Sequence, residues 1–257
     1  MAIVTIEGEP GAGKSSFLAA LAIQHMHGPL ARSARRQCDA FIDRLNACGH
    51  NLPHAPKHLV YTDFGVTYKS PDCGTREAWD VDGNKLGFET DNFKPQYIYP
   101  YSTIFLDEAQ QYFYSRDFKE FPKNVSRWFE KHRKFGLNIY LAAQRGGLIE
   151  LNIRSLGGAI YIYDVDVKRT FTGKIKTVWR IERWEHYKDY VEGKPGVKGT
   201  HTFDGNVWQY FDTTEGRELF IPRSTSTSFD ARKHLDFGLS PQGVLDFVKA
   251  HPQEKSY

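Results

Sequence analysis

This sequence has few cysteines and no long apolar segment, and both scarcities narrow the kind of protein it encodes. Only three cysteines occur among 257 residues, with no Cys-x-x-Cys pair. An odd number of widely spaced thiols argues against a disulfide framework and against a paired-cysteine metal site, so we expect reduced thiols in a cytosolic protein. No run of about 18 apolar residues is present, and the chain opens with a strand pattern. We therefore expect neither a membrane-spanning helix nor a cleavable signal peptide.

The sequence also lacks a strong charge of either sign. Its 34 basic and 31 acidic residues give a formal net charge of +3, too balanced to indicate a nucleic-acid-binding protein as a whole. DNA contact would have to come from local basic clusters, which are Arg32, Arg35 and Arg36; Arg127, Lys131, His132, Arg133 and Lys134; and Lys168, Arg169, Lys174 and Lys176. Phe171 and Trp179, beside the third cluster, have rings that could stack on single-stranded bases. The alternative is that the charges form a solvated surface and the rings belong to the core.

Strand-like and helix-like segments alternate over the first two thirds of the chain. The β-type segments AIVTIE, HLVYTDF, STIFLDE, LNIYLAAQ and GAIYIYDVDV alternate with helical patterns such as KSSFLAALAIQHM and NVSRWFEKHRKFG. This alternation predicts an α/β fold with a mostly parallel central sheet flanked by helices. Residues 65–95 have weak periodicity, and we expect an irregular excursion or a small hairpin there.

The pattern changes after Val167. The segments KTVWRIERWEHY and NVWQYFDTTE predict antiparallel strands, joined by the loop VEGKPGVKGTHTFDGN without an intervening helix. We therefore expect a core at residues 1–166, a β-rich extension of the same domain at 167–220, and a tail at 221–257. The tail begins Ser/Thr-rich and contains a helix-like segment that starts at Ser240.

The octet GEPGAGKS, from Gly8 to Ser15, matches G-x-x-x-x-G-K-[ST] between a predicted strand and a predicted helix. Its glycines let backbone N–H groups converge on phosphate oxygens, and the helix start adds positive potential. We expect Lys14 to reach the β- and γ-phosphates and the Ser15 hydroxyl to bind Mg²⁺. The expected nucleotide-binding residues are Gly8, Pro10, Gly11, Ala12, Gly13, Lys14, Ser15 and Ser16. The motif alone leaves GTPases, kinases and motor ATPases open.

Polar residues at two predicted strand ends narrow that choice. Asp107, at the end of STIFLDE, is expected to hold the magnesium's water shell, and Glu108 is expected to polarise an attacking water. An adjacent acidic pair suits hydrolysis, because a small-molecule kinase uses its acceptor hydroxyl as the nucleophile. Gln144, at the end of LNIYLAAQ, is a candidate sensor of the γ-phosphate. Alternatively, Gln144 only terminates the strand and hydrogen-bonds a loop.

Arg133 and Arg154 are the candidate arginine fingers. In ring ATPases, one subunit inserts an arginine into its neighbour's active site and stabilises charge in the transition state. Arg133 precedes the Gln144 strand, and Arg154 lies in the helix-like segment after it. The alternative for these residues is a surface arginine paired with Glu130 or Glu150 on the same helical face.

Five segments carry a family resemblance. GEPGAGKS, STIFLDEAQ, RWFEKHRKFGLNIYLAAQ, IRSLGGAIY and YFDTTE occur in this order. Together they resemble the zonular occludens toxin (Zot) domain family, the assembly and export ATPases of filamentous phages, within the FtsK–HerA group of DNA-pumping ATPases. The resemblance covers roughly residues 1–215. It implies an ASCE-type P-loop NTPase fold with ATP on residues 11–16 and Mg²⁺ on Ser15 and Asp107. It also implies Glu108 as catalytic base, Gln144 as sensor and Arg133 as finger.

The resemblance also implies partners and a location. A finger acting in trans requires a ring of identical subunits, a hexamer in this family, and the expected substrate is phage DNA, single-stranded and contacted independently of sequence. Phage coat or membrane assembly proteins are further expected partners, in the host cytoplasm or at the cytoplasmic face of the inner membrane. Filamentous-phage members usually continue into a transmembrane helix that this sequence lacks. A truncated cytosolic domain, a soluble relative and a capsid-filling packaging ATPase all agree with that difference.

The leading interpretation is therefore an ATP-hydrolysing motor of phage morphogenesis. Two alternatives of other classes remain open. A nucleotide-dependent scaffold would assemble with ATP without significant turnover. A P-loop small-molecule kinase would turn over without oligomerisation or DNA, and the acidic pair and Gln144 argue against it.

Overall fold

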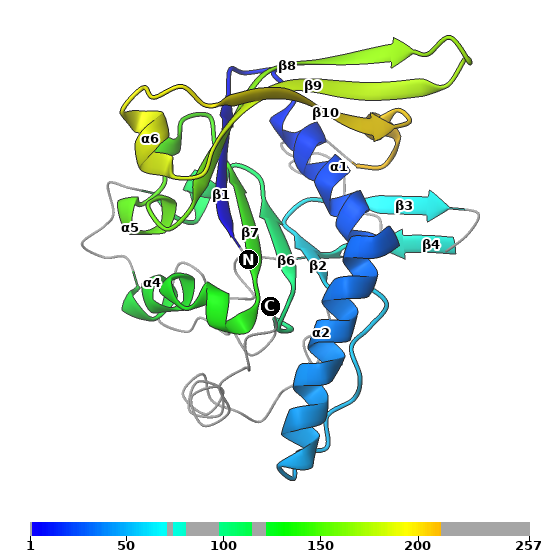
Figure 1. Ribbon diagram of the computed structural model, residues 1–257, viewed down its shortest axis with the longest axis vertical. Coiled ribbons are helices and arrows are strands. Elements are labelled where there is room, and N and C mark those ends of the chain that lie inside the picture. Colours follow the sequence, from blue (N-terminus) through cyan, green and yellow to red (C-terminus); the bar gives the residue numbers. More distant parts are fainter. Residues whose placement is uncertain (1, 71–73, 81–97, 115–121, 212–257) are drawn as a thin grey trace, which may run out of the picture.

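The computed structural model describes residues 2–70, 74–80, 98–114 and 122–211, which are built around an eight-stranded sheet (Figure 1). From one edge to the other, the strands are β10 (Val197–Asp204), β9 (Ile175–Trp184), β8 (Gly158–Arg169), β1 (Ile3–Gly8), β7 (Asn138–Ala142), β6 (Thr103–Leu106), β2 (Val60–Thr62) and β5 (Trp79–Asp80). The six strands from β8 to β5 are parallel, and β9 and β10 join antiparallel. The predicted α/β fold with an antiparallel extension is confirmed.

The order of the central strands determines where a ligand can bind. β1 pairs with β7 on one side and with β8 on the other, and β7 separates β1 from β6. The strand that leads into GEPGAGKS and the strand that ends just before Asp107 are thus one strand apart. The carboxyl ends of these parallel strands meet at one edge of the sheet, which is where ligands bind in open α/β sheets.

Helices cover both faces of the sheet. The α-helices are α1 (Lys14–Met26), α2 (Gly28–Ala47), α4 (Lys123–Glu130), α5 (Leu151–Arg154) and α6 (Tyr187–Val191). Short 3-10 helices are η2 (Ala109–Gln111), η4 (His132–Phe135), η5 (Gly146–Leu148) and η6 (Val207–Gln209). In Figure 1, α1 lies on one side of the sheet and is followed, after a break at His27, by α2, whereas α4 and α5 lie on the other side.

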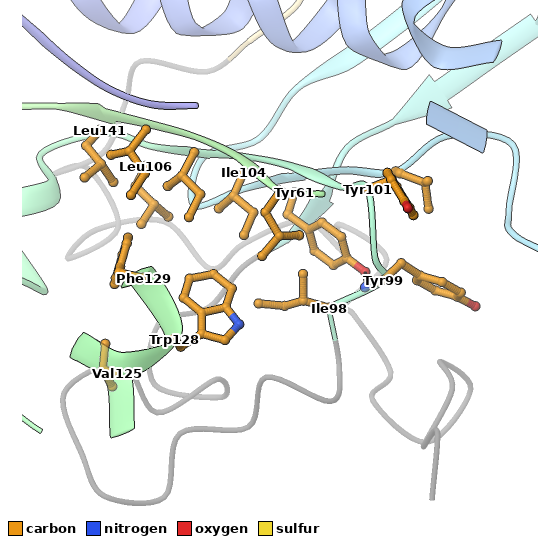
Figure 2. Close-up of a cluster of buried hydrophobic side chains, with 14 of the residues drawn as sticks. Tyr61, Ile98, Tyr99, Tyr101, Ile104, Leu106, Val125, Trp128, Phe129 and Leu141 are labelled. Atoms are coloured by element: carbon orange, nitrogen blue, oxygen red, sulfur yellow. Dashed lines mark hydrogen bonds between the residues drawn. The ribbon is translucent and has the colours of Figure 1, made fainter. Parts of the chain in front are cut away.

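Each central strand is buried on both faces, as its unbroken apolar sequence predicts. Phe105 of β6 belongs to the cluster under α1, whereas its neighbours Ile104 and Leu106 belong to the cluster under α4. Figure 2 shows the α4 side, where Trp128 and Phe129 approach these strand residues. Two separate hydrophobic layers therefore hold the sheet and fix the ends of its strands.

The helix α2 carries a single apolar stripe. Its apolar stripe is buried, and it consists of Ala31, Cys38, Phe41, Ile42 and Leu45. The excursion at 65–95 includes a hairpin of β3 (Thr67–Ser70) and β4 (Gly74–Glu77), which confirms that expectation as far as the described residues reach. Residues 81–95 lie outside them.

The C-terminal part requires two corrections. The second added strand is β10, which lies inside the segment predicted to be a loop, whereas NVWQYF begins with the turn η6. A short helix, α6, also intervenes where none was expected. β10 is an edge strand, and among its residues only Phe203 is buried, so its sequence carries almost no alternating apolar signal.

The predicted boundary between the core and the β-rich extension, at residue 166, falls within β8. This strand crosses residue 166 without interruption and continues the same sheet into β9 and β10. The tail from 221 to 257, with its helix-like segment at Ser240, lies outside the described residues. Within the part that is described, none of the helices is both long and apolar enough to cross a membrane.

Candidate nucleotide-binding site

The GEPGAGKS octet forms a loop between β1 and α1, as the motif predicts. Ala12 N donates to Glu9 O over 3.0 Å and closes the turn. Gly11 and Gly13 have φ of 82° and 89°, in the left-handed region where only glycine is unstrained. Gly13 then caps α1, so the loop lies at the positive end of a 13-residue helix. This is an anion-binding geometry built from backbone N–H groups.

Lys14 lies within the loop rather than in solvent. It is buried, and its Nζ donates to Gly8 O at 2.9 Å and to Glu9 O at 3.3 Å. Burial raises the pKa of the Asp107 carboxyl, and the positive charge of Lys14 opposes that rise, so the two groups interact. The structure thus brings together the predicted phosphate lysine and the predicted magnesium aspartate.

Asp107 lies close enough to Ser15 for the two side chains to interact. Burial raises the pKa of the Asp107 carboxyl, and the Ser15 side chain is the largest of the influences that lower it. The structure therefore brings the two predicted magnesium ligands near each other. Mg²⁺ that binds with a nucleotide keeps phosphate and water oxygens as ligands, so one hydroxyl and one carboxylate fit it. In the described ranges, no set of three His, Cys, Asp or Glu forms a metal cluster.

Asp63 is an acidic residue of the site that the sequence analysis did not single out. It follows β2 directly, and its Oδ1 accepts a hydrogen bond from Asp107 N over 2.8 Å. The signal was present in HLVYTDF, an apolar strand ending in a carboxylate like STIFLDE. Asp63 fixes the backbone from which the Asp107 side chain projects.

Glu108 has a strained backbone. Its φ of 44° lies in the left-handed region, unusual for a residue with a side chain, and its N–H donates to Asp107 Oδ1 at 3.0 Å. The Gln110 side chain donates to the Glu108 carboxylate. Strain that neighbouring hydrogen bonds hold in place is typical of functional sites.

Gln144 lies at the same edge of the sheet. β1 and β7 pair Ile6 with Ala142, and Ala143 N donates to Ile6 O at 3.0 Å, which extends the ladder by one residue. Gln144 follows at the level of Gly8, and its side chain is exposed. The position of Gln144 agrees with a sensor of the γ-phosphate. Its described contacts do not distinguish that role from one of only terminating the strand.

Arg133 lies at the opposite edge of the sheet. It belongs to η4, immediately before β7 begins, and it is exposed. His132 is predicted to belong to the basic cluster around Arg133, but its side chain is buried. Its Nδ1 lies 2.6 Å from Phe129 O. Burial lowers the pKa of His132, so this imidazole does not contribute to a phosphate-binding surface.

Arg154 belongs to a network within its own subunit. Its Nη1 donates to the Tyr187 hydroxyl at 3.3 Å, and its guanidinium lies 5.3 Å from the centre of that ring. The Tyr187 hydroxyl donates in turn to Oε1 of Glu7, which is only 6% exposed on β1. Tyr190 donates to Oε2 of the same carboxylate. Glu150, the predicted partner of Arg154, instead caps α5 by accepting from Ile153 N.

Trp179 contacts the phosphate loop from β9. Its Nε1 lies 3.2 Å from both Gly13 O and Ser16 Oγ, and its ring is fully buried. Of the two alternatives for Trp179, base stacking and a place in the core, the structure confirms the core, because its ring is buried beside Phe17. Ser16 Oγ donates to Gly13 O at 2.8 Å, so this side chain supports the loop.

The chain is similar to one known protein family and to several solved structures. The family model of Zonular occludens toxin (Zot) matches residues 2–164. Among curated proteins, none matches. The crystal structure of the N-terminal domain of zonular occludens toxin from Neisseria meningitidis is 19% identical, with a TM-score of 0.47, over 82% of this chain and 98% of that chain.

The genome packaging NTPase B204 from Sulfolobus turreted icosahedral virus 2, solved with ATP-gammaS, is also similar. It is 17% identical, with a TM-score of 0.34, over 67% of this chain and 77% of that chain. The family model, by contrast, spans well over half of the present sequence, from β1 through the P-loop and the acidic strand into β8. The chain therefore belongs to the Zonular occludens toxin (Zot) family.

Proposed function

We propose that this chain is an ATP-hydrolysing motor of phage morphogenesis, acting in virion assembly, extrusion or genome packaging. It works as a homo-oligomeric ring, a hexamer, on single-stranded DNA. The observation that carries the proposal is the geometry of the phosphate loop, in which the buried Lys14 donates to Gly8 O and Gly13, at positive φ, begins α1. Membership of the Zot family supports the phage context.

In the proposed reaction, Lys14 and the loop N–H groups hold the β- and γ-phosphates of ATP. Ser15 and Asp107 would hold Mg²⁺, which would supply positive charge against the phosphate oxygens. Burial favours a protonated Asp107, whereas the nearby Ser15 side chain and the Lys14 charge favour the carboxylate that Mg²⁺ needs. The residues present therefore fit the metal.

Glu108 is the proposed general base. Its carboxylate takes a proton from the water that attacks the γ-phosphorus, while the bond to the β-phosphate oxygen breaks and ADP leaves. The hydrogen bond from Gln110 and the strained backbone support a fixed orientation of this carboxylate. Gln144 is the proposed sensor that positions the same water.

Arg133 is the proposed finger in trans. It is exposed and lies at the edge of the sheet opposite to its own P-loop, so it is available to the site of another subunit. Arg154 is less suited to this role, because its guanidinium already bonds and stacks on Tyr187 within its own subunit.

Steady-state ATP hydrolysis across a protein concentration series tests this function. Turnover per subunit should rise with concentration, increase with single-stranded DNA, and fall by roughly 10²-fold or more in Glu108→Gln while ATP binding persists. Glu185→Gln, an exposed glutamate outside the site, is the matched control and should retain wild-type turnover. Binding without turnover in the wild type would favour the scaffold. Turnover independent of both concentration and DNA would favour the kinase.

A further inference from the structure

The β8–β9 hairpin projects beyond the sheet at the nucleotide edge. β8 pairs with β1 only as far as Ile162, which lies opposite Gly8, and then continues to Arg169 with β9 as its partner. At about 3.3 Å per residue, the segment past Ile162 adds roughly 20 Å. Figure 1 shows these strands extending past the end of β1. The hairpin thus starts at the phosphate loop and ends in solvent.

The base of this projection contacts the loop at a single glycine. Val165 and Trp179 are cross-strand partners, and both contact Gly13. A Cβ built on Gly13 would lie 2.6 Å from Val165 Cγ1, so the backbone and this side chain are in close contact. Trp179 Nε1 donates to Gly13 O over 3.2 Å. Any shift of Gly13 on binding phosphate therefore meets a packed side chain on each strand.

The tip of the hairpin is both basic and apolar. Residues 167–176 contain four cations and no carboxylate, and the cations are Lys168, Arg169, Lys174 and Lys176. Phe171, at the turn, is fully exposed, and Val167 and Ile175 are also exposed. A fully exposed phenylalanine has no packing role among the residues that the structure describes, so its surroundings suggest an external partner.

The arrangement of the charges favours an anionic partner. Lys168 and Lys176 lie directly opposite each other across the two strands, a pairing of like charges that destabilises a sheet. The Lys168 ammonium lies 3.7 Å from the Asp166 carboxylate, and the Lys176 ammonium lies 3.2 Å from the Asp204 carboxylate. Exposed ion pairs of this kind contribute little to stability. A polyanion at the tip would relieve this repulsion, whereas an apolar protein surface would not.

We propose that the tip of the β8–β9 hairpin binds single-stranded DNA, with Phe171 stacked on a base and the flanking cations on phosphates. Contact of Val165 and Trp179 with Gly13 links this affinity to the nucleotide state of the P-loop. The inference rests on the proposed function, because it names the element through which the motor holds its DNA. Stacking and phosphate contact together are the chemistry of sequence-independent single-strand binding.

Fluorescence anisotropy of a labelled oligothymidylate with the full chain tests the contact. Phe171→Ala should weaken binding about 5- to 150-fold, the range expected for loss of one stacked base. Lys168→Gln with Lys174→Gln should weaken binding and reduce the slope of log K against log salt by about 1.4. Basal ATP hydrolysis without DNA should stay at the wild-type rate in both variants. Lys188→Gln, on α6 and exposed, is the control.

The outcomes separate this contact from the motor itself. If the wild type hydrolyses ATP and binds DNA, and both tip variants bind equally well, the hairpin proposal is overturned and the motor stands. If the wild type hydrolyses ATP but does not bind DNA, and Phe171→Ala alters only its oligomeric state, the tip is a protein contact. If the wild type binds DNA but has no ATPase activity, and the tip variants bind DNA more weakly than the wild type, the proposed motor fails and the DNA contact stands.

The link to nucleotide is tested with Trp179→Phe, which keeps an aromatic ring but removes the N–H that bonds Gly13. The ratio of DNA affinities in saturating ATP-gammaS and in saturating ADP should differ from one in the wild type and move toward one in the variant. A merely structural role of Trp179 would lower stability without changing this ratio. Equal DNA affinities in both nucleotides for the wild type would overturn the link.

Discussion

The Tyr187 hydroxyl donates a hydrogen bond to Oε1 of Glu7 over 3.1 Å and joins helix α6 to the strand that enters the phosphate loop. A second bond, from Tyr190 to Oε2, satisfies the other oxygen of this buried carboxylate. Burial, and after it the proximity of Glu7, raises the pKa of both phenols, of Tyr187 to about 12. The segment that follows β9 therefore stabilises the nucleotide edge of the sheet.

Tyr187→Phe should lower the free energy of unfolding by about 1–3 kcal/mol, because a buried carboxylate loses one of its donors. Chemical denaturation monitored by tryptophan fluorescence measures this change. Glu7→Gln and the double variant complete a double-mutant cycle. A coupling energy near zero would show that the two side chains contribute independently and would contradict the interaction.

Asp107→Asn should reduce the affinity for ATP in the presence of Mg²⁺ by about 10- to 100-fold, as expected for loss of a group that orients bound metal. The variant should unfold at or above the wild-type temperature, because burial raises the pKa of this carboxyl and so disfavours its charged form. Nucleotide titrations with Mg²⁺ and with EDTA measure the effect. Asp43→Asn, on the exposed side of α2, is the control. Equal Mg²⁺ dependence in Asp107→Asn and the wild type would argue against the metal role.

Mixing two inactive variants tests Arg133 in trans. Arg133→Ala and Lys14→Ala should each lose most ATP hydrolysis, and a one-to-one mixture should recover activity. About a quarter of the interfaces then combine an intact P-loop with a neighbour's intact arginine, by random assortment. Mixing Lys14→Ala with Glu108→Gln should recover nothing, because those residues belong to one subunit's own site. A mixture no more active than its components would remove Arg133 from the shared site.

Gly13→Ala should destabilise the protein more than Gly49→Ala. Both glycines have positive φ, of 89° and 96°, so each substitution introduces backbone strain of about 1–2 kcal/mol. Only at Gly13 does the new Cβ also meet Val165, at 2.6 Å, whereas nothing lies within 4 Å at Gly49. Thermal unfolding of the two variants isolates the contact. Equal losses would show that the hairpin base is loosely packed on the loop.

Stability should decrease in acid through His25. Burial lowers the pKa of His25 from 6.5 to about 4, so the unfolded chain binds this proton more readily than the folded chain does. The neutral ring, 3.1 Å from Thr103 Oγ1, contributes fully above about pH 6.5, and its contribution is lost as the pH falls toward 4. The loss amounts to about 3 kcal/mol. Denaturation at several pH values should show that the free energy of unfolding depends less steeply on pH in His25→Gln than in the wild type. Identical slopes in the two proteins would contradict this account.

Much of the fold was predictable because its signals are contiguous. The glycine spacing before Lys14 specifies a phosphate loop, and the unbroken apolar run ending at Asp107 specifies a buried parallel strand. β10 could not be predicted, because a polar edge strand with one buried residue has no periodic signal. Asp63 was missed although its strand resembles the Asp107 strand, since its role depends on β2 lying next to β6.

The sequence by itself determined a P-loop, an acidic strand end and an alternation that requires a mostly parallel sheet. All three depend on residues close together in the chain, whose spacing and conformational preferences act locally. Tertiary structure alone decided that Trp179 bonds Gly13, which is 166 residues away, and that Val165 packs beside it. Those contacts follow from the pairing of β8 with β1 and of β9 with β8, because sheet register sets which distant side chains meet.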